Sequence, residues 1–192
     1  MIYSIDYKKK RILFIDFDGT LVETVSGETF PIDVADVKVK HEVVEALKKL
    51  CLGTNLRFIC IVSNQGGVEL GHYSIDAMNA KVFGIAGIIH AAINDALAKH
   101  NKPKIAMQVR FCTANDKDEP NRKPNIGMLE KSLRNIECHY PDVDTDNAVQ
   151  FMIGDASGKK GDFSDSDKQC AVNAEIDYID VRDFVEDMKT FQ

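Results

Sequence analysis

Short apolar runs recur along the chain and alternate with segments of helical spacing. The runs predict strands, because residues buried on both faces of a parallel sheet are almost continuously apolar. We expect these strands at residues 12–15, 58–62, 107–112, 149–153 and 176–179. Between them, apolar residues spaced at helical intervals predict helices. We expect these helices at residues 41–50, 74–100, 126–136, 170–174 and 183–188.

This alternation of strands and helices predicts an α/β fold, a parallel sheet with helices on both faces. A length of 192 residues with 44% hydrophobic residues suits one domain with a sizeable core, so we expect residues 1–192 to form a single domain. Residues 23–39 are rich in turn formers and lack a helical period, which predicts a small flap after the first strand. Gly84 and Gly87 weaken the longest predicted helix, which we expect to bend or break there.

Polar residues of a few chemical types stand where predicted strands end or helices open. In a parallel α/β sheet the carboxyl ends of the strands meet at one edge, and ligands bind in the crevice beyond it. We therefore expect these residues to converge on a single crevice. They are Asp16, Asp18, Ser63, Asn64, Lys123 and Asp155.

The predicted crevice holds the groups that phosphoryl transfer needs. Alternate positions put Asp16 and Asp18 on one side of an extended chain, where two carboxylates repel and favour a divalent cation. With Asp155 they form an oxygen-donor set that suits Mg²⁺. Ser63 can bind phosphate oxygens, and Lys123 supplies positive charge to the same group. A carboxylate can then act as the covalent nucleophile.

Each of these residues also has a simpler explanation when it is taken alone. The first two aspartates could end a strand in a polar turn, and Ser63 could cap a helix. Lys123 could be a solvated loop residue, and Asp155 could lie in a turn. Their order behind successive strands favours one site over four separate accidents.

The segment Asp16–Val22 resembles the first motif of the haloacid dehalogenase superfamily of phosphotransferases, D-x-D-G-T-[LV]. Ser63, Lys123 and Gly154–Asp155 resemble the second, third and fourth motifs, so the resemblance covers almost the whole chain. It implies a single-domain Rossmann-like sheet of the haloacid dehalogenase type. It also implies that the first aspartate of the segment is the nucleophile and the second is the general acid/base.

Within that superfamily, five segments are similar to the phosphatase domain of polynucleotide kinase 3′-phosphatase. They are Asp16–Val22 with Ser26–Pro31, Ser63–Gln65, Arg122–Pro124 with Gly127–Met128, Gly154–Gly158, and Asp162–Ser164 with Asp167, Ala171 and Asn173. This resemblance implies Mg²⁺-dependent removal of a 3′-phosphate from nucleic-acid ends, with DNA favoured, as in DNA end repair. The reaction would pass through a phosphoaspartate.

The same resemblance implies a role for each site residue. Asp16 would attack phosphorus, and Asp18 would protonate the leaving oxygen and then activate water. Arg122 would face the substrate backbone, and Asp162 would be the second acid of the fourth motif. The implied catalytic residues are Asp16, Asp18 and Lys123, the phosphate- and substrate-binding residues are Gly19, Thr20, Ser63, Asn64 and Arg122, and the Mg²⁺ ligands are Asp16, the Asp18 carbonyl and Asp155.

Three features depart from the family pattern. Ser63 stands where this subfamily usually has Thr, and Glu69 places an acid where substrate contacts are expected. Asp155 and Asp162 are spaced more widely than in the general superfamily pattern. Residues 154–160 superficially resemble a P-loop, but the spacing is one residue short and no Ser or Thr follows the lysine. We therefore expect a stand-alone phosphatase without a kinase domain.

Composition restricts partners and compartment. The formal net charge of −6 counts against a general nucleic-acid coat, although it allows a local basic site. The basic run Lys8–Arg11 abuts the first strand, which favours a solvated lead-in over a localisation signal. No apolar run is long enough to span a membrane, and residues 1–7 lack a signal-peptide core. Five cysteines without a C-x-x-C pair favour a reducing, intracellular compartment, cytoplasmic or nuclear, and we expect a monomer.

Two other functions remain as alternatives. The first is a phosphatase of small metabolites, such as histidinol phosphate or a sugar bisphosphate, which the acidic charge favours. Relatives of that kind often carry a zinc loop of Cys and His, which this sequence lacks. The second is a non-catalytic binding domain on the same fold, which the intact Asp16, Asp18, Lys123 and Asp155 make improbable.

Overall fold

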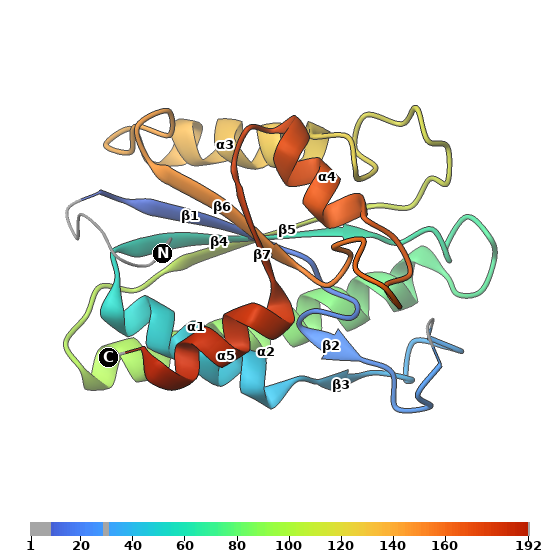
Figure 1. The fold of residues 1–192 in the computed structure, drawn as a ribbon, viewed down its shortest axis with the longest axis horizontal. Helices are drawn as coiled ribbons and strands as arrows, with labels where there is room; N and C mark the ends of the chain where they lie inside the picture. Colours follow the sequence, from blue (N-terminus) through green and yellow to red (C-terminus); the bar gives the residue numbers. More distant parts are fainter. Residues whose placement is uncertain (1–8, 29–30, 192) are drawn as a thin grey trace.

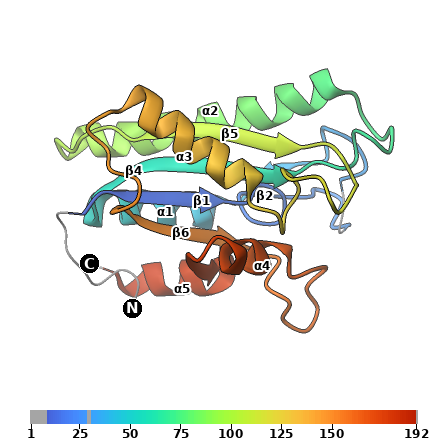
Figure 2. The same ribbon diagram turned by 90° about the horizontal axis from the view of Figure 1, so that it is seen from above.

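The computed structural model describes residues 9–28 and 31–191. Residues 1–7, Lys8 of the basic run and residues 29–30 of the expected flap lie outside this description. Five parallel strands form one sheet in the order β5-β4-β1-β6-β7 (Figures 1 and 2). The strands are β1 (Arg11–Ile15), β4 (Leu56–Asn64), β5 (Ala106–Cys112), β6 (Val149–Gly154) and β7 (Asp177–Asp180). The predicted α/β architecture is confirmed, and β1 is its central strand.

Helices cover both faces of the sheet, as the alternating pattern predicts (Figure 1). One face is covered by α1 (His41–Gly53), α2 (Ile75–Lys99) and α5 (Val181–Thr190), and the other by α3 (Gly127–His139) and α4 (Ser166–Asn173). The central strand serves both cores: Leu13 and Ile15 pack on the first face, and Ile12 and Phe14 on the second. Burial on both faces explains why this strand is a continuous apolar run.

The longest helix, α2, is continuous, so the expected break at Gly84 and Gly87 is wrong. Both glycines lie on the exposed side of α2, where an added Cβ would point into open space. Val82, Ala86 and Ile89 on the opposite side are buried in the core. Each glycine costs about 1 kcal/mol relative to alanine, which the burial of several large side chains outweighs.

Among the described residues, α2 is also the helix that is long and apolar enough to cross a membrane by length and composition. An 18-residue window of it has a mean hydropathy of 1.3, and 33% of that window is buried. This qualifies the sequence-based statement that no segment has that character. Because the helix buries one side against α1 and β5, we describe it as a covering helix of the domain.

The segment after β1 forms the small flap that the turn-rich composition predicts. Two short strands, β2 (Val22–Glu23) and β3 (Lys38–Val39), pair antiparallel at its base. The Asp36 carboxylate accepts hydrogen bonds from the Ser26 hydroxyl (2.6 Å) and from the Ile32 N–H (3.0 Å). These contacts fold the described part of the flap beside the carboxyl end of the sheet (Figure 1).

Two local interpretations of the sequence are corrected. Arg11 belongs to β1 and is only 2% exposed, so the basic run is not entirely a solvated lead-in. The fourth helix begins at Ser166, four residues earlier than the apolar pattern predicts. Its first turn is polar, but Asp167 within that turn is buried. A buried carboxylate there is costly unless it is paired, and its partner is described next.

Candidate active site

Three carboxylates meet at the carboxyl edge of the sheet. They belong to Asp16 after β1, Asp155 after β6 and Asp167 in the first turn of α4. One oxygen of each lies within 4.8 Å of the others. The sequence predicts the first two at this edge, whereas Asp167 is an addition that the structure reveals. We refer to these three side chains as the acidic group.

The Lys123 ammonium bridges two members of the acidic group. Its Nζ lies 2.5 Å from Asp16 Oδ1 and 2.7 Å from Asp167 Oδ1, and all three side chains are almost completely buried. The Asn64 side chain holds the backbone of Lys123 in place. It accepts a hydrogen bond from the Lys123 N–H (2.9 Å) and donates one to the Lys123 carbonyl (3.0 Å). Asn64, predicted as a substrate contact, therefore positions the lysine.

The three carboxylates and the one ammonium of this site carry a formal excess of negative charge. Burial raises the pKa of the Asp16 carboxyl well above its usual range; Lys123 opposes this rise, and Asp167 and Asp155 add to it. Burial also raises the pKa of Asp155, and Asp167 is the second cause. Burial alone would lower the pKa of Lys123, but Asp16 and Asp167 outweigh it and raise that pKa. One ammonium among three carboxylates leaves negative charge that a divalent cation would neutralise.

The donor set fits Mg²⁺, which takes hard oxygen ligands and few carboxylates. Asp16 and Asp155 are the best-placed ligands, because both oxygens of Asp167 already accept hydrogen bonds, from Lys123 and from the Ala156 N–H. Gly19 completes this cradle. Its φ is +81°, and a Cβ there would lie 2.2 Å from Asp155 Oδ2, so a side chain does not fit.

Asp18 lies beside the acidic group but has different partners. Lys81 Nζ donates to its Oδ1 at 3.2 Å, and Gln65 Nε2 donates to its Oδ2. Gln65 also donates to Ser63 Oγ at 2.9 Å, and its carbonyl oxygen accepts a hydrogen bond from the Tyr73 hydroxyl. Ser63 lines the same cavity as Asp16 and Asp18. Asp18, Ser63 and Gln65 thus form one connected network.

Two further predicted residues support the acidic group from behind. Thr20 is buried and its hydroxyl donates to Asp155 Oδ1 at 3.3 Å, so it orients that carboxylate. Gly19 accepts a hydrogen bond on its carbonyl from Lys40 Nζ at 3.0 Å. These two residues, predicted as phosphate contacts, lie beside Asp155 and Lys40.

Arg122 and Asp162 lie farther out. Arg122 lines the cavity, and its guanidinium donates to the Ala114 carbonyl at 2.7 Å. Asp162 is not part of the acidic group. It accepts a hydrogen bond from the Ser157 hydroxyl (2.6 Å) and pairs with Arg182 (2.9 Å). The Ser157 hydrogen bond, followed by the Arg182 contact, lowers the pKa of Asp162 to about 2, which indicates a role in holding the loop.

A cavity of about 710 Å³ opens above these residues. Its mouth carries exposed apolar side chains from three separate loops, namely Ile32, Leu70 and Phe163. Glu69, the acid that departs from the family pattern, accepts a hydrogen bond from the Asn115 N–H at 2.5 Å. Its carboxylate therefore ties together two loops of the mouth.

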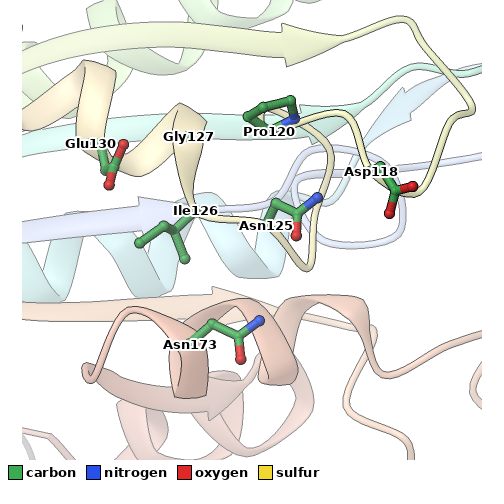
Figure 3. A pocket seen from close by; sticks show the side chains of 7 residues that line it. All are labelled: Asp118, Pro120, Asn125, Ile126, Gly127, Glu130 and Asn173. Atoms are coloured by element: carbon green, nitrogen blue, oxygen red, sulfur yellow. The ribbon is translucent and has the colours of Figure 1, made fainter.

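A smaller cavity of about 440 Å³ lies between α4 and the loop of residues 113–126, which carries Lys123 and is called the lysine loop (Figure 3). Asn125 precedes α3, and Asn173 ends α4 (Figure 3). The Asn173 amide donates to the Pro124 carbonyl at 3.0 Å, next to Lys123. Asn173 and Pro124 both lie in segments that resemble the family, and this contact joins those segments. Through it, α4 holds the lysine loop in place.

Three site residues have no individual role in the sequence-based account: Asp167, Gln65 and Lys81. Asp167 and Gln65 do lie in segments that resemble the family. Lys81 has a different signal, because it shares a helix face with the apolar Met78, Val82 and Ile85. A lysine on the buried face of a helix requires a partner, and its partner is Asp18.

The fold and the site have the features expected of a protein of the haloacid dehalogenase type, the class that the sequence resemblance indicates. A solved structure of D,D-heptose 1.7-bisphosphate phosphatase from B. bronchiseptica, complexed with magnesium and phosphate, has the same fold. It aligns with a TM-score of 0.54 at 22% identity over 88% of this chain and 78% of that chain.

The family described as polynucleotide kinase 3 phosphatase matches residues 11–184, and this chain belongs to that family. The bifunctional polynucleotide phosphatase/kinase of Schizosaccharomyces pombe is 28% identical over 173 residues, 89% of this chain and 36% of that protein. The histidine biosynthesis bifunctional protein HisB of Xylella fastidiosa is 32% identical over 151 residues, 75% of this chain and 33% of that protein. The chain therefore spans about a third of each of these two relatives.

Proposed function

We propose that this chain is a Mg²⁺-dependent polynucleotide 3′-phosphatase that leaves a 3′-hydroxyl on a nucleic-acid end, with DNA as the favoured substrate. The observation that carries the proposal is the apolar mouth of the active-site cavity. Ile32, Leu70 and Phe163 are each more than half exposed there. Exposed aromatic and apolar side chains are platforms on which nucleobases stack. A small, highly polar phosphate ester has little apolar surface to cover them.

The charge distribution suits a contact with one end of a strand. The net charge of −6 gives no overall attraction for a polyanion. Among the residues that the structure describes, Arg122 and Lys123 are the arginine and lysine side chains that line the cavity. Lys123 is occupied by the acidic group, which leaves Arg122 for a neighbouring backbone phosphate. The enzyme would thus engage the terminal nucleotide and about one further phosphate.

The geometry supports a two-step reaction through a phosphoaspartate. In the first step, an Asp16 oxygen attacks phosphorus, and the 3′-oxygen leaves with a proton from Asp18. In the second step, Asp18 takes a proton from water, which attacks the phosphorus of the phosphoaspartate. Inorganic phosphate leaves and both carboxyl groups return to their starting states. Positioned acid/base catalysis of this kind contributes roughly 10²–10⁴-fold.

The neighbouring residues hold the reacting groups and balance their charge. Ser63, which lines the cavity, can donate to a phosphoryl oxygen, and Lys123 keeps the nucleophile oriented. A Mg²⁺ ion held by Asp16, Asp155 and the Asp18 carbonyl would supply positive charge to the carboxylates and the phosphoryl oxygens. The apolar mouth excludes water from the covered end of the strand.

The test is a phosphate-release panel with matched variants. A 3′-phosphorylated oligonucleotide should be turned over faster than histidinol phosphate or a sugar bisphosphate. Arg122→Ala should reduce oligonucleotide turnover more than turnover of a small aryl phosphate, and should lower the salt dependence by about one phosphate contact. Lys123→Ala should reduce both alike, because this residue supports the nucleophile. Faster turnover of histidinol phosphate would overturn the substrate assignment.

The second candidate is a phosphatase of small metabolites. The similarity to HisB and the acidic net charge favour it. The same panel separates the two candidates, because this alternative expects Arg122→Ala to affect all substrates equally. That this chain is monomeric and intracellular remains our prediction.

A further inference from the structure

Lys81 is a charged residue where the fold has no general need for one. It lies on the core side of α2, and its side chain is 2% exposed. Its ammonium lies 5.6 Å from the ring centroids of Phe17 and Tyr73. A methionine would fill the same volume without the cost of burying a charge. The position of this lysine therefore calls for an explanation beyond packing.

The ammonium contacts one oxygen of Asp18, the residue to which the proposed function gives the proton transfers. Lys81, which belongs to α2, donates a hydrogen bond from Nζ to Asp18 Oδ1 at 3.2 Å. Gln65, which follows β4, donates one to Asp18 Oδ2. Tyr73 in turn holds Gln65 through its hydroxyl. Donors on two separate elements thus fix both oxygens, and with them the rotation of the carboxylate plane.

Lys81 does not line the active-site cavity, whereas Asp18 and Tyr73 do. A side chain buried in this way has no route to the substrate, so its effect on the reaction must pass through Asp18. Phe17 and Tyr73 limit the directions that the ammonium can take, and the rings attract a cation at this distance. The lysine is therefore itself held, as a support for a catalytic group requires.

We propose that Lys81 is a positioning residue that, together with Gln65, holds the Asp18 carboxyl group in the orientation from which it gives its proton to the leaving oxygen. This inference rests on the proposed mechanism and goes beyond it by assigning a role to a residue that never touches the substrate. Misplacement of a catalytic group by about 1 Å can cost roughly 10²-fold in rate.

The readout that distinguishes positioning from simple stabilisation is the leaving group. An alkoxide, such as a nucleoside 3′-oxygen, needs a proton as it leaves, whereas 2,4-dinitrophenolate does not. The ratio kcat/KM reports the steps up to release of the leaving group. Lys81→Met should therefore lower kcat/KM for thymidine 3′-phosphate by about 10- to 100-fold and for 2,4-dinitrophenyl phosphate by less than about threefold.

The matched control is Val82→Ala, a truncation of the adjacent buried residue on the same helix. It should lower the melting temperature and leave the ratio between the two substrates unchanged. Lys81→Gln is a second variant in case the methionine variant folds poorly, and it should show the same selective loss. Asp18→Asn gives the full effect of the missing proton donor.

Two results would overturn the inference. In the first, kcat/KM of the Lys81 variants falls equally for both substrates, or for neither, while Asp18→Asn shows the selective loss. The positioning role then fails and the mechanism stands. If Asp18→Asn itself shows no preference between the substrates, the acid/base assignment of the proposed function fails as well. A selective loss in both Lys81 variants, absent from Val82→Ala, supports the proposal.

Discussion

The most informative stability experiment removes Lys123, the ammonium that pairs with two members of the acidic group. Lys123→Met deletes an ammonium that lies 2.5 Å from Asp16 and 2.7 Å from Asp167 and keeps most of the side-chain volume. The three carboxylates of the acidic group, which lie within 4.8 Å of one another, then lose the positive charge of Lys123. We expect the variant to be less stable than the parent protein, and the loss to depend on pH.

The size of the loss follows from the burial of the pair. Breaking a buried ion pair by removing one partner costs about 3–5 kcal/mol. For a protein of this length each kcal/mol lowers the melting temperature by about 2–4 °C, so the expected decrease is roughly 6–20 °C. Because Asp155 is partly exposed and can take up a proton, we expect the lower half of this range.

The pH dependence has a definite sign. Burial raises the pKa values of Asp16 and Asp155 in the folded protein, and loss of Lys123 raises that of Asp16 further. The folded state then binds more protons than the unfolded state, so its stability falls as the pH rises from about 4 through these raised pKa values. The defect should therefore be larger at pH 8 than at pH 5.

Urea unfolding at both pH values measures this effect. Lys10→Met is the matched control, since it removes an exposed ion pair with Asp142 that should be worth at most about 1 kcal/mol. Adding Asp167→Asn to Lys123→Met should restore part of the loss by removing one carboxylate. A loss no larger than that of the control, or a loss that is equal at pH 5 and pH 8, would refute the description of Lys123 as a buried countercharge.

Three other predictions test the site. Asp16→Asn should abolish phosphate release while the far-UV spectrum and the cooperative unfolding transition remain; near-normal turnover would exclude Asp16 as the nucleophile. In the parent protein, Mg²⁺ should raise the melting temperature more at pH 8 than at pH 5, because protons compete for the ligands; EDTA should remove activity, and undiminished turnover in EDTA would exclude the metal. Ser157 and Arg182 lower the pKa of Asp162 to about 2 in the folded protein, below the value of about 3.9 in the unfolded chain. The resulting stability of the loop is present above about pH 3.9 and is lost as the pH falls from there towards 2. Asp162→Asn should therefore make residues 156–165 more sensitive to protease at pH 7, and an unchanged cleavage rate would contradict this role.

The strands and the location of the site could be predicted from the sequence for clear physical reasons. A strand buried on both faces is a continuous apolar run, and the polar residues that follow such strands must meet at one edge of a parallel sheet. That argument brings Asp16, Ser63 and Asp155 together without any knowledge of the loops. It also places Lys123 nearby, although its contact with Asp16 depends on Asn64 and on the fold of its loop.

The remaining features depend on tertiary contacts and packing, which local sequence patterns do not show. Asp162 and Asp167 follow Asp155 in sequence, and only the path of the loop decides which one reaches the acidic group. The continuity of α2 reflects packing energy that exceeds the cost of Gly84 and Gly87. The role of Lys81 depends on a contact across 63 residues of sequence.

The central claim is that the acidic group removes a phosphate from the 3′ end of a strand by means of Asp16. The most direct measurement compares kcat/KM for two forms of one oligonucleotide, phosphorylated at the 3′ end or at the 5′ end, in the presence of Mg²⁺. The Asp16→Asn variant is the control for contaminating activity. Our account predicts a preference for the 3′-phosphate of at least roughly tenfold, and no release by the variant. Equal or faster release from the 5′ end, or release that persists in Asp16→Asn, would contradict it.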